Sequence, residues 1–154
     1  MLNRTVRSNE SGFTLLELMI VISIIAILAA AIIPNFVGFD AEARVSATQT
    51  NLNTLRTRIT LFRAKENRYP TELEELTTIT YDDMGVKRPY LDKIPAEMIS
   101  GKGDSSVENR TLENGLPGDG GWVYITDQAK AVVDVTEPLS SRWGSYEGQN
   151  PSEW

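Results

Sequence analysis

One carboxylate, Glu17, lies inside a run of apolar residues. Of all the side chains in the sequence, it is the one whose position most needs a chemical explanation. From Phe13 to Ile33 the chain reads FTLLELMIVISIIAILAAAII, in which Thr14, Glu17 and Ser23 are the polar members. An ionisable group in such a stretch is costly unless a partner compensates its charge. The sequence therefore predicts a function for Glu17 and a partner of opposite charge.

Four aspartates and a glycine-rich segment are the other candidates for chemistry. Oxygen ligands from loops suit Ca²⁺, but the spacing of these aspartates does not match an EF-hand, and solvated carboxylates on turns are the alternative. The segment 118–121 is followed by neither Lys nor a helix start, so its glycines are expected to form turns and not a phosphate loop. Three tryptophans are expected to serve core packing or subunit contact more than sugar binding. The aspartates that could contribute to a calcium site are Asp104, Asp119, Asp127 and Asp134.

The composition excludes several classes of function. The 154 residues include no His and no Cys, which rules out a Ser-His-Asp triad, a cysteine nucleophile, thiolate or imidazole metal sites and disulfides. A net charge of −6, from 15 basic and 21 acidic residues, does not suggest the clustered basic surface that phosphate binding needs. We therefore expect neither an enzyme nor a nucleic-acid partner.

The apolar run is long enough to cross a membrane. As a helix, its 21 residues would span about 31 Å, close to the hydrocarbon thickness of a bilayer. Arg4 and Arg7 precede it, whereas Asp40 and Glu42 follow it. By the positive-inside rule, this asymmetry predicts a single span with a cytoplasmic amino terminus and an extracytoplasmic remainder.

Two simpler interpretations of the run compete with a functional one. A cleavable secretory signal peptide would use the small residues 29–31 as its cleavage site, but the uncharged run after Glu17 is longer than usual for such a signal. A plain single-span anchor explains the length of the run. It gives Glu17 no role.

The segment from Gly12 to Val21, GFTLLELMIV, resembles the type III signal of the type IV pilin superfamily, which includes type IV pilins and the pseudopilins of type II secretion. The resemblance implies that a prepilin peptidase cuts between Gly12 and Phe13, methylates the new amine of Phe13 and leaves the apolar helix in place. Residues 1–12 would then be a leader. Glu17 would become the fifth residue of the mature chain, where the family carries its glutamate.

A charge pair between Glu17 and the new amine of Phe13 follows from their spacing. The two residues are four apart, about one helical turn, so they share one face of the helix. In a filament of stacked helices, the amine of one subunit can lie against the carboxylate of a neighbour and set the axial register. The alternatives are an intrachain pair with Phe13, or a Glu17 that faces water.

A second helical segment follows the apolar one. Pro34 and Gly38 are expected to kink the helix, although a simple stop at Pro34 is the alternative. The apolar positions beyond them recur at spacings of three and four and predict an amphipathic helix that continues to Asn67. Packing against a small sheet is favoured over a coiled-coil dimer. The predicted stripe comprises Ala41, Val45, Thr48, Leu52, Leu55, Ile59 and Phe62.

The remaining residues, 68–154, are expected to form a β-rich head. The predicted elements are a capping box of Thr71 and Glu74 before a short helix, at most one strand within 107–112, and an antiparallel hairpin of 122–126 and 130–136. The tail, 137–154, either wraps the sheet or is partly disordered. The segment 69–95 is similar to major pseudopilins, although their Asp-Pro-Trp-Gly segment is absent. The fold class is α+β, and the resemblance implies the pilin fold, with a long N-terminal helix on a small antiparallel sheet.

The resemblance implies a structural protein with four segments. Residues 1–12 are the leader, 13–34 the transmembrane and assembly helix, 35–67 its amphipathic second half and 68–154 the head. The expected partners are further copies of the chain, the prepilin peptidase, membrane lipid before assembly, and an inner-membrane assembly platform with its ATPase. The product would be a periplasmic or cell-surface filament that acts in secretion, adhesion or motility. The alternative is a membrane-anchored periplasmic binding domain that does not polymerise.

Overall fold

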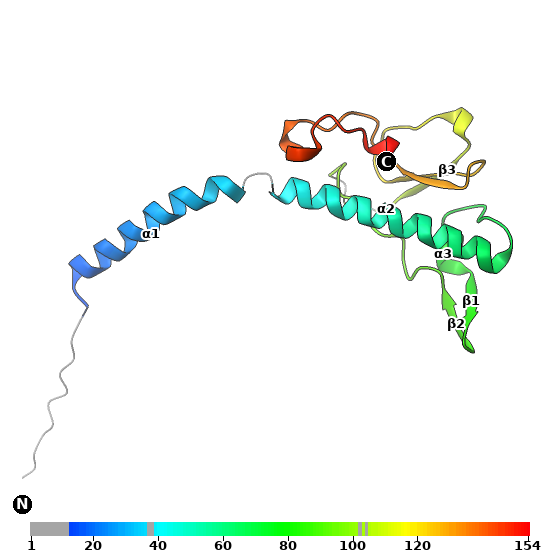
Figure 1. The fold of residues 1–154 in the computed structure, drawn as a ribbon, viewed down its shortest axis with the longest axis horizontal. Coiled ribbons are helices and arrows are strands. Elements are labelled where there is room, and N and C mark those ends of the chain that lie inside the picture. Colours follow the sequence, from blue (N-terminus) through cyan, green and yellow to red (C-terminus); the bar gives the residue numbers. More distant parts are fainter. Residues whose placement is uncertain (1–12, 37–38, 102, 104) are drawn as a thin grey trace, which may run out of the picture. The chain divides into compact units, whose positions relative to one another are not determined.

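The structure is a computed structural model that describes residues 13–36, 39–101, 103 and 105–154 (Figure 1). It divides into two compact units, Met1–Val37 and Gly38–Trp154, and each is described by itself. The described residues of the first unit contain one helix. The second contains a long helix, two small sheets and a folded tail.

Helix α1, Leu15–Phe36, makes up the described part of the first unit apart from residues 13 and 14. Its large apolar side chains from Leu15 to Ile33 are largely solvent-exposed, so this unit offers them no core. The segment Leu15–Ile33 has a mean hydropathy of 2.9 and is long and apolar enough to cross a membrane. The helix runs two residues beyond Pro34, which lies in its last turn. Gly38, the second predicted kink residue, lies outside the described residues, so the kink stays a prediction.

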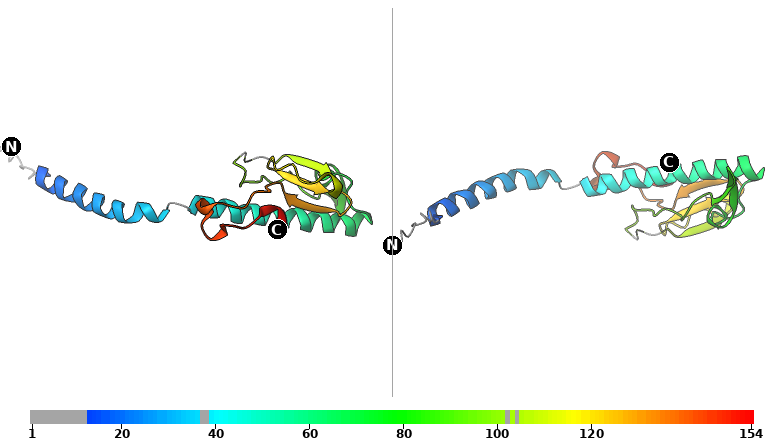
Figure 2. Two further views of the ribbon diagram at one scale, coloured as in Figure 1. Left: turned by 90° about the horizontal axis from the view of Figure 1, so that it is seen from above. Right: turned by 90° about the horizontal axis from the view of Figure 1, so that it is seen from below.

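Helix α2, Phe39–Glu66, carries the core of the second unit on one face. The predicted stripe is confirmed. Every member except Ala41, which is partly buried, is buried; the buried members are Val45, Thr48, Leu52, Leu55, Ile59 and Phe62. This face packs against the sheet and the tail, as both views in Figure 2 show. The preference for helix-on-sheet packing is therefore confirmed.

The main sheet contains three strands in the order β3, β4, β5. Strands β4, Trp122–Ile125, and β5, Lys130–Val133, form the predicted antiparallel hairpin, with Trp122 opposite Val133. Strand β3, Val107–Arg110, falls in the predicted segment but pairs parallel to β4. The sheet is mixed and not purely antiparallel, because the glycine-rich connection 111–121 carries the chain back to the end of the sheet where β3 began.

A second hairpin was not anticipated from the sequence. Strands β1, Thr80–Asp83, and β2, Val86–Pro89, pair antiparallel around Met84 and Gly85. Both turn residues have positive φ, 54° and 87°, as a two-residue type I′ turn requires. The side chain of Asp82 accepts a 2.8 Å hydrogen bond from the N–H of Gly85. The signal available in the sequence was the Asp-Met-Gly segment between two short runs that contain β-branched residues.

The short helix α3, Glu75–Thr78, begins later than expected. Thr71 bonds Glu75 and not Glu74, and its N–H lies 3.1 Å from Oε1 of Glu75. Arg68 holds the other oxygen of Glu75 at 2.8 Å. The predicted Thr71–Glu74 capping box is wrong because a turn over 71–74 precedes the helix, and the carboxylate of Glu74 instead accepts from Asn109 at 2.9 Å.

The tail folds onto α2 and β5 through two 3-10 segments, Ser141–Tyr146 and Pro151–Glu153. Trp143 is buried in a cluster with Val45, Ile99 and Leu139. The Nε of Arg56 on α2 donates to the carbonyl of Ala131 at 3.2 Å, and its guanidinium also donates to the carbonyl of Trp154. Of the two alternatives for the tail, the wrapped one is correct.

Candidate functional site

The start of α1 is organised by a reciprocal bond pattern between Thr14 and Glu17. The N–H and the hydroxyl of Thr14 donate to Oε2 of Glu17, at 2.9 and 2.8 Å. The N–H of Glu17 lies 3.2 Å from the Thr14 hydroxyl oxygen, which accepts from it. This is a capping box, in which a Thr before the helix and a Glu three residues later satisfy N–H groups that lack intrahelical partners. This role of Thr14 was not predicted, although the Thr-x-x-Glu spacing that signals it is present in the sequence.

The capping box explains how a carboxylate is accommodated at the edge of an apolar helix. A negative charge in the first turn also interacts favourably with the helix dipole. Ser23 is the other polar side chain within the span. Its hydroxyl donates to the carbonyl of Met19 at 2.7 Å and is therefore hydrogen-bonded within the helix. Among residues 15–33, this leaves Glu17 as the ionisable group that a partner can recognise.

The structure places Phe13 beside this box with its side chain 74% exposed. In the uncut chain its nitrogen belongs to a peptide bond, and a positive amine arises there only after a cut between residues 12 and 13. Gly12 lies outside the described residues. The cut, the methylation and the pairing of the Phe13 amine with Glu17 therefore stay predictions.

Within the described residues, the candidate calcium ligands do not form one cluster. Asp134 is buried, and its two oxygens accept from the N–H groups of Gly118 and Asp119 at 2.8 and 2.9 Å. Asp127 lies at the opposite end of β5 and accepts from the N–H of Leu112 at 3.0 Å. Asp104 lies outside the described residues. Among the described residues, no group of three or more acidic side chains is arranged to hold a metal ion; calcium binding stays a prediction.

A second buried carboxylate, Glu97, was not anticipated. It is fully buried and accepts hydrogen bonds from the N–H groups of Ile99, Ser100 and Gly121, at 3.0 Å for Ser100 and 3.3 Å for Gly121. Glu97 thus ties the segment after the β1–β2 hairpin to the glycine-rich loop that leads into β4. A Cβ on Gly120, where φ is 85°, would lie 2.5 Å from the Cβ of Ser100, so this close approach requires glycine.

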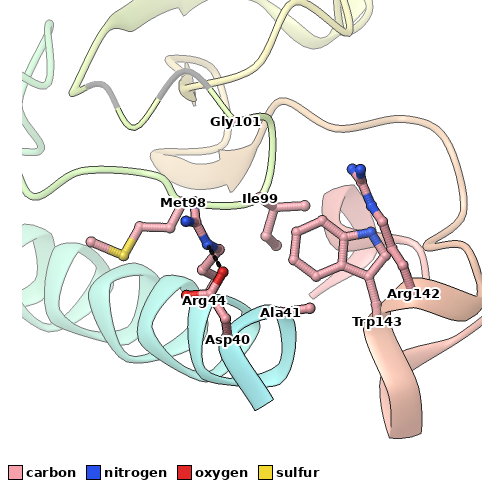
Figure 3. Close-up of a pocket in the computed structure, with 8 residues that line it drawn as sticks. All are labelled: Asp40, Ala41, Arg44, Met98, Ile99, Gly101, Arg142 and Trp143. Atoms are coloured by element: carbon pink, nitrogen blue, oxygen red, sulfur yellow. Dashed lines mark hydrogen bonds and ion pairs between the residues drawn. The ribbon is translucent and has the colours of Figure 1, made fainter. Parts of the chain in front are cut away.

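A pocket lies at the start of α2, between the helix, residues 98–101 and the tail (Figure 3). Asp40 and Arg44 pair at 2.9 Å on the helix side. On the opposite side, the guanidinium of Arg142 lies 4.9 Å from the centroid of the Trp143 ring. Among the described lining residues, Asp40 is the only carboxylate, and it is already paired with Arg44.

Comparison with known proteins agrees with the arrangement at α1. A family model for the prokaryotic N-terminal methylation motif matches residues 7–33. The type IV major pilin protein PilA of Myxococcus xanthus is 48% identical over 65 residues, which cover 42% of this chain and 30% of that pilin. The type II secretion system core protein G of Aeromonas hydrophila is 29% identical over 98 residues, 59% of this chain and 68% of that protein.

A third relative aligns over most of the chain. The type IV major fimbrial protein FimA of Dichelobacter nodosus is 28% identical over 138 residues, 90% of this chain and 73% of that protein. No solved structure matches the chain. The chain therefore carries the methylation motif at its start and is similar to type IV major pilins and to a type II secretion core protein, which are members of the type IV pilin superfamily. The helix and small sheets of the structure are consistent with the pilin fold.

Proposed function

We propose that this chain is the structural subunit of a type IV pilus-like filament, and that it polymerises through α1. The observation that carries the proposal is an apolar helix whose large apolar side chains from Leu15 to Ile33 are exposed, and which bears one carboxylate within the methylation motif. Such an apolar surface must be shielded from water. Lipid shields it before assembly, and neighbouring helices shield it afterwards. A membrane-anchored binding domain that stays monomeric would need the apolar helix and could use Glu17 in the capping box, but it would need no partner for the charge of Glu17.

Processing would change the environment of Glu17 in a defined way. In the uncut chain, the carboxylate is held by Thr14 at 2.8 and 2.9 Å. A prepilin peptidase that cut after Gly12 would create a methylated amine on Phe13, one residue from Thr14. That amine, from the same chain or from a neighbour, can then compete for Glu17, and pairing between chains would fix the stagger of the helices.

The remaining partners and the location follow from the same proposal. The basic leader and the acidic residues after the span orient the head away from the cytoplasm. An inner-membrane assembly platform and its ATPase would extract the helix into a periplasmic or cell-surface filament. The relatives named for type IV pili and for type II secretion support both branches, in adhesion or motility and in protein secretion.

The test compares Glu17→Val with Ser23→Ala as a matched control in the same helix. Both variants should be cut and methylated, since neither alters residues 12 and 13. We expect Glu17→Val to lose filaments in sheared-cell fractions and electron micrographs, whereas Ser23→Ala should assemble. Filaments of Glu17→Val at the normal amount would refute the role of the charge pair. A parent chain that never forms filaments would refute the proposed function.

A further inference from the structure

The β1–β2 hairpin is a ribbon with two open edges. In the described part of the chain, its sheet contains two strands, and β3, β4 and β5 form a separate sheet. In Figure 1 the hairpin extends from the body of the head, with its turn pointing away from the three-stranded sheet. Open strand edges are templates for pairing with another chain unless charges or other devices protect them.

The inner face of the ribbon is anchored to the head. The ring of Tyr81 lies 4.8 Å from that of the buried Tyr90, and Lys65 on α2 lies 5.5 Å from the Tyr81 centroid. Because side chains alternate along a strand, Asp82 and its cross-strand partner Lys87 lie on the other face. Both are exposed. The head thus holds the ribbon in place and leaves one face free.

Charge is divided between the two strands. Strand β1 carries Asp82 and Asp83, whereas β2 carries Lys87 and Arg88, so one edge is acidic and the other is basic. Inside the hairpin, Arg88 and Asp83 lie 3.5 Å apart, with 62% and 45% of their side chains exposed. An exposed pair of this kind contributes little stability. These charges can therefore exchange partners at little cost.

The turn adds an apolar contact. Met84 is 100% exposed and has a φ of 54°, a conformation in which Asn or Gly is usual and a long side chain is disfavoured. Nothing that it touches in the folded head compensates for this choice, since its side chain is fully in solvent. Burial against a partner would compensate for it.

We propose that this hairpin is a contact surface between neighbouring heads, in which the acidic β1 edge of one copy meets the basic β2 edge of the next. The proposal rests on the proposed filament function. A self-paired dimer, β1 to β1 or β2 to β2, would place like charges together. A contact from β1 to β2 is instead head-to-tail, and such contacts can repeat into open helical filaments.

Charge reversal in the full chain tests this contact. Two variants each give the hairpin a single sign of charge. The acidic variant combines Lys87→Glu with Arg88→Glu, and the basic variant combines Asp82→Lys with Asp83→Lys. Each should reduce the filament yield by about tenfold, because like charges then face each other across the contact. Expressed together, the two variants should restore filaments by alternating along the fibre. A misfolded head would not be rescued in this way, so rescue separates a lost contact from a lost fold.

Cross-linking supplies an independent readout, since the chain has no cysteine of its own. Copies with Asp82→Cys should form disulfides with copies carrying Lys87→Cys in the filament, but not with one another. Lys130→Cys, at an exposed position on β5, is the matched control and should form none with either. Normal filament yield from both charge variants, or equal cross-linking in every combination, would overturn the hairpin contact. The filament function itself would survive that result and would fail only if the parent chain formed no filaments.

Discussion

The structure predicts a large loss of stability when the buried carboxylate of Glu97 is replaced. Its carboxylate is fully buried, and its oxygens accept from the N–H groups of Ile99, Ser100 and Gly121. Glu97→Gln replaces one of these oxygens with an amide NH₂, which cannot accept. The variant loses at least one charge-assisted hydrogen bond, worth about 1.5–3 kcal/mol. Its amide NH₂ also places a donor against a buried backbone N–H, so that two donors face each other.

The expected cost of Glu97→Gln is about 3 kcal/mol, a large fraction of the stability of a domain of this size. The assay is urea unfolding of residues 38–154, followed by the fluorescence of the buried Trp122 and Trp143. Glu72→Gln, at an exposed position, is the control and should change the free energy of unfolding by less than about 0.5 kcal/mol.

Two outcomes would refute this reasoning. A loss below about 1 kcal/mol for Glu97→Gln would show that the N–H groups are satisfied in another way. An equal loss for Glu72→Gln would show that the effect comes from the overall charge and not from the buried bonds. Unfolding midpoints should be compared only between variants whose unfolding free energy depends equally steeply on urea concentration. A change in that slope reports a changed unfolded state.

Two further predictions concern the tail and the pH dependence of the head. Gly144→Ala should loosen the tail and cost about 2 kcal/mol, because φ is 55° and a Cβ there would push aside the carboxylate of Glu42, which accepts from the N–H of Ser145 at 2.9 Å; unchanged protection of the tail from proteolysis would contradict this. Burial, with nearby negative charge, raises the pKa of Tyr124 to about 12, and its hydroxyl donates to the carbonyl of Pro70 at 2.8 Å. An unfolded phenol ionises near pH 10, so the unfolded chain binds fewer protons between about pH 10 and 12, and stability should fall across that window. Tyr124→Phe should flatten this fall, and an unchanged pH profile for the variant would exclude Tyr124 as its cause.

The helices and the core stripe could be predicted from the sequence because their signals are local. The apolar run gave α1, and the spacing of Val45, Thr48 and Leu52 gave the buried face of α2. The β4–β5 hairpin followed from β-branched residues on either side of a turn. In each case, the pattern that predicts the element lies within the element.

Other features depended on contacts between distant segments. The parallel pairing of β3 depends on the path of a long glycine-rich loop, and the bonds of Glu97 join it to Gly121, which is 24 residues away. No local pattern reports such contacts. The capping box of Thr14 and Glu17 is different, because it is a local pattern whose Thr-x-x-Glu spacing can be read directly from the sequence.

The amino terminus of the assembled protein tests the central claim most directly. Filaments sheared from cells and analysed by mass spectrometry should yield a chain that begins with N-methylated Phe13 and retains the whole of α1. A chain that keeps residues 1–12, or that has been cut after Ala31 and lost the helix, would contradict assembly through a processed amino-terminal helix.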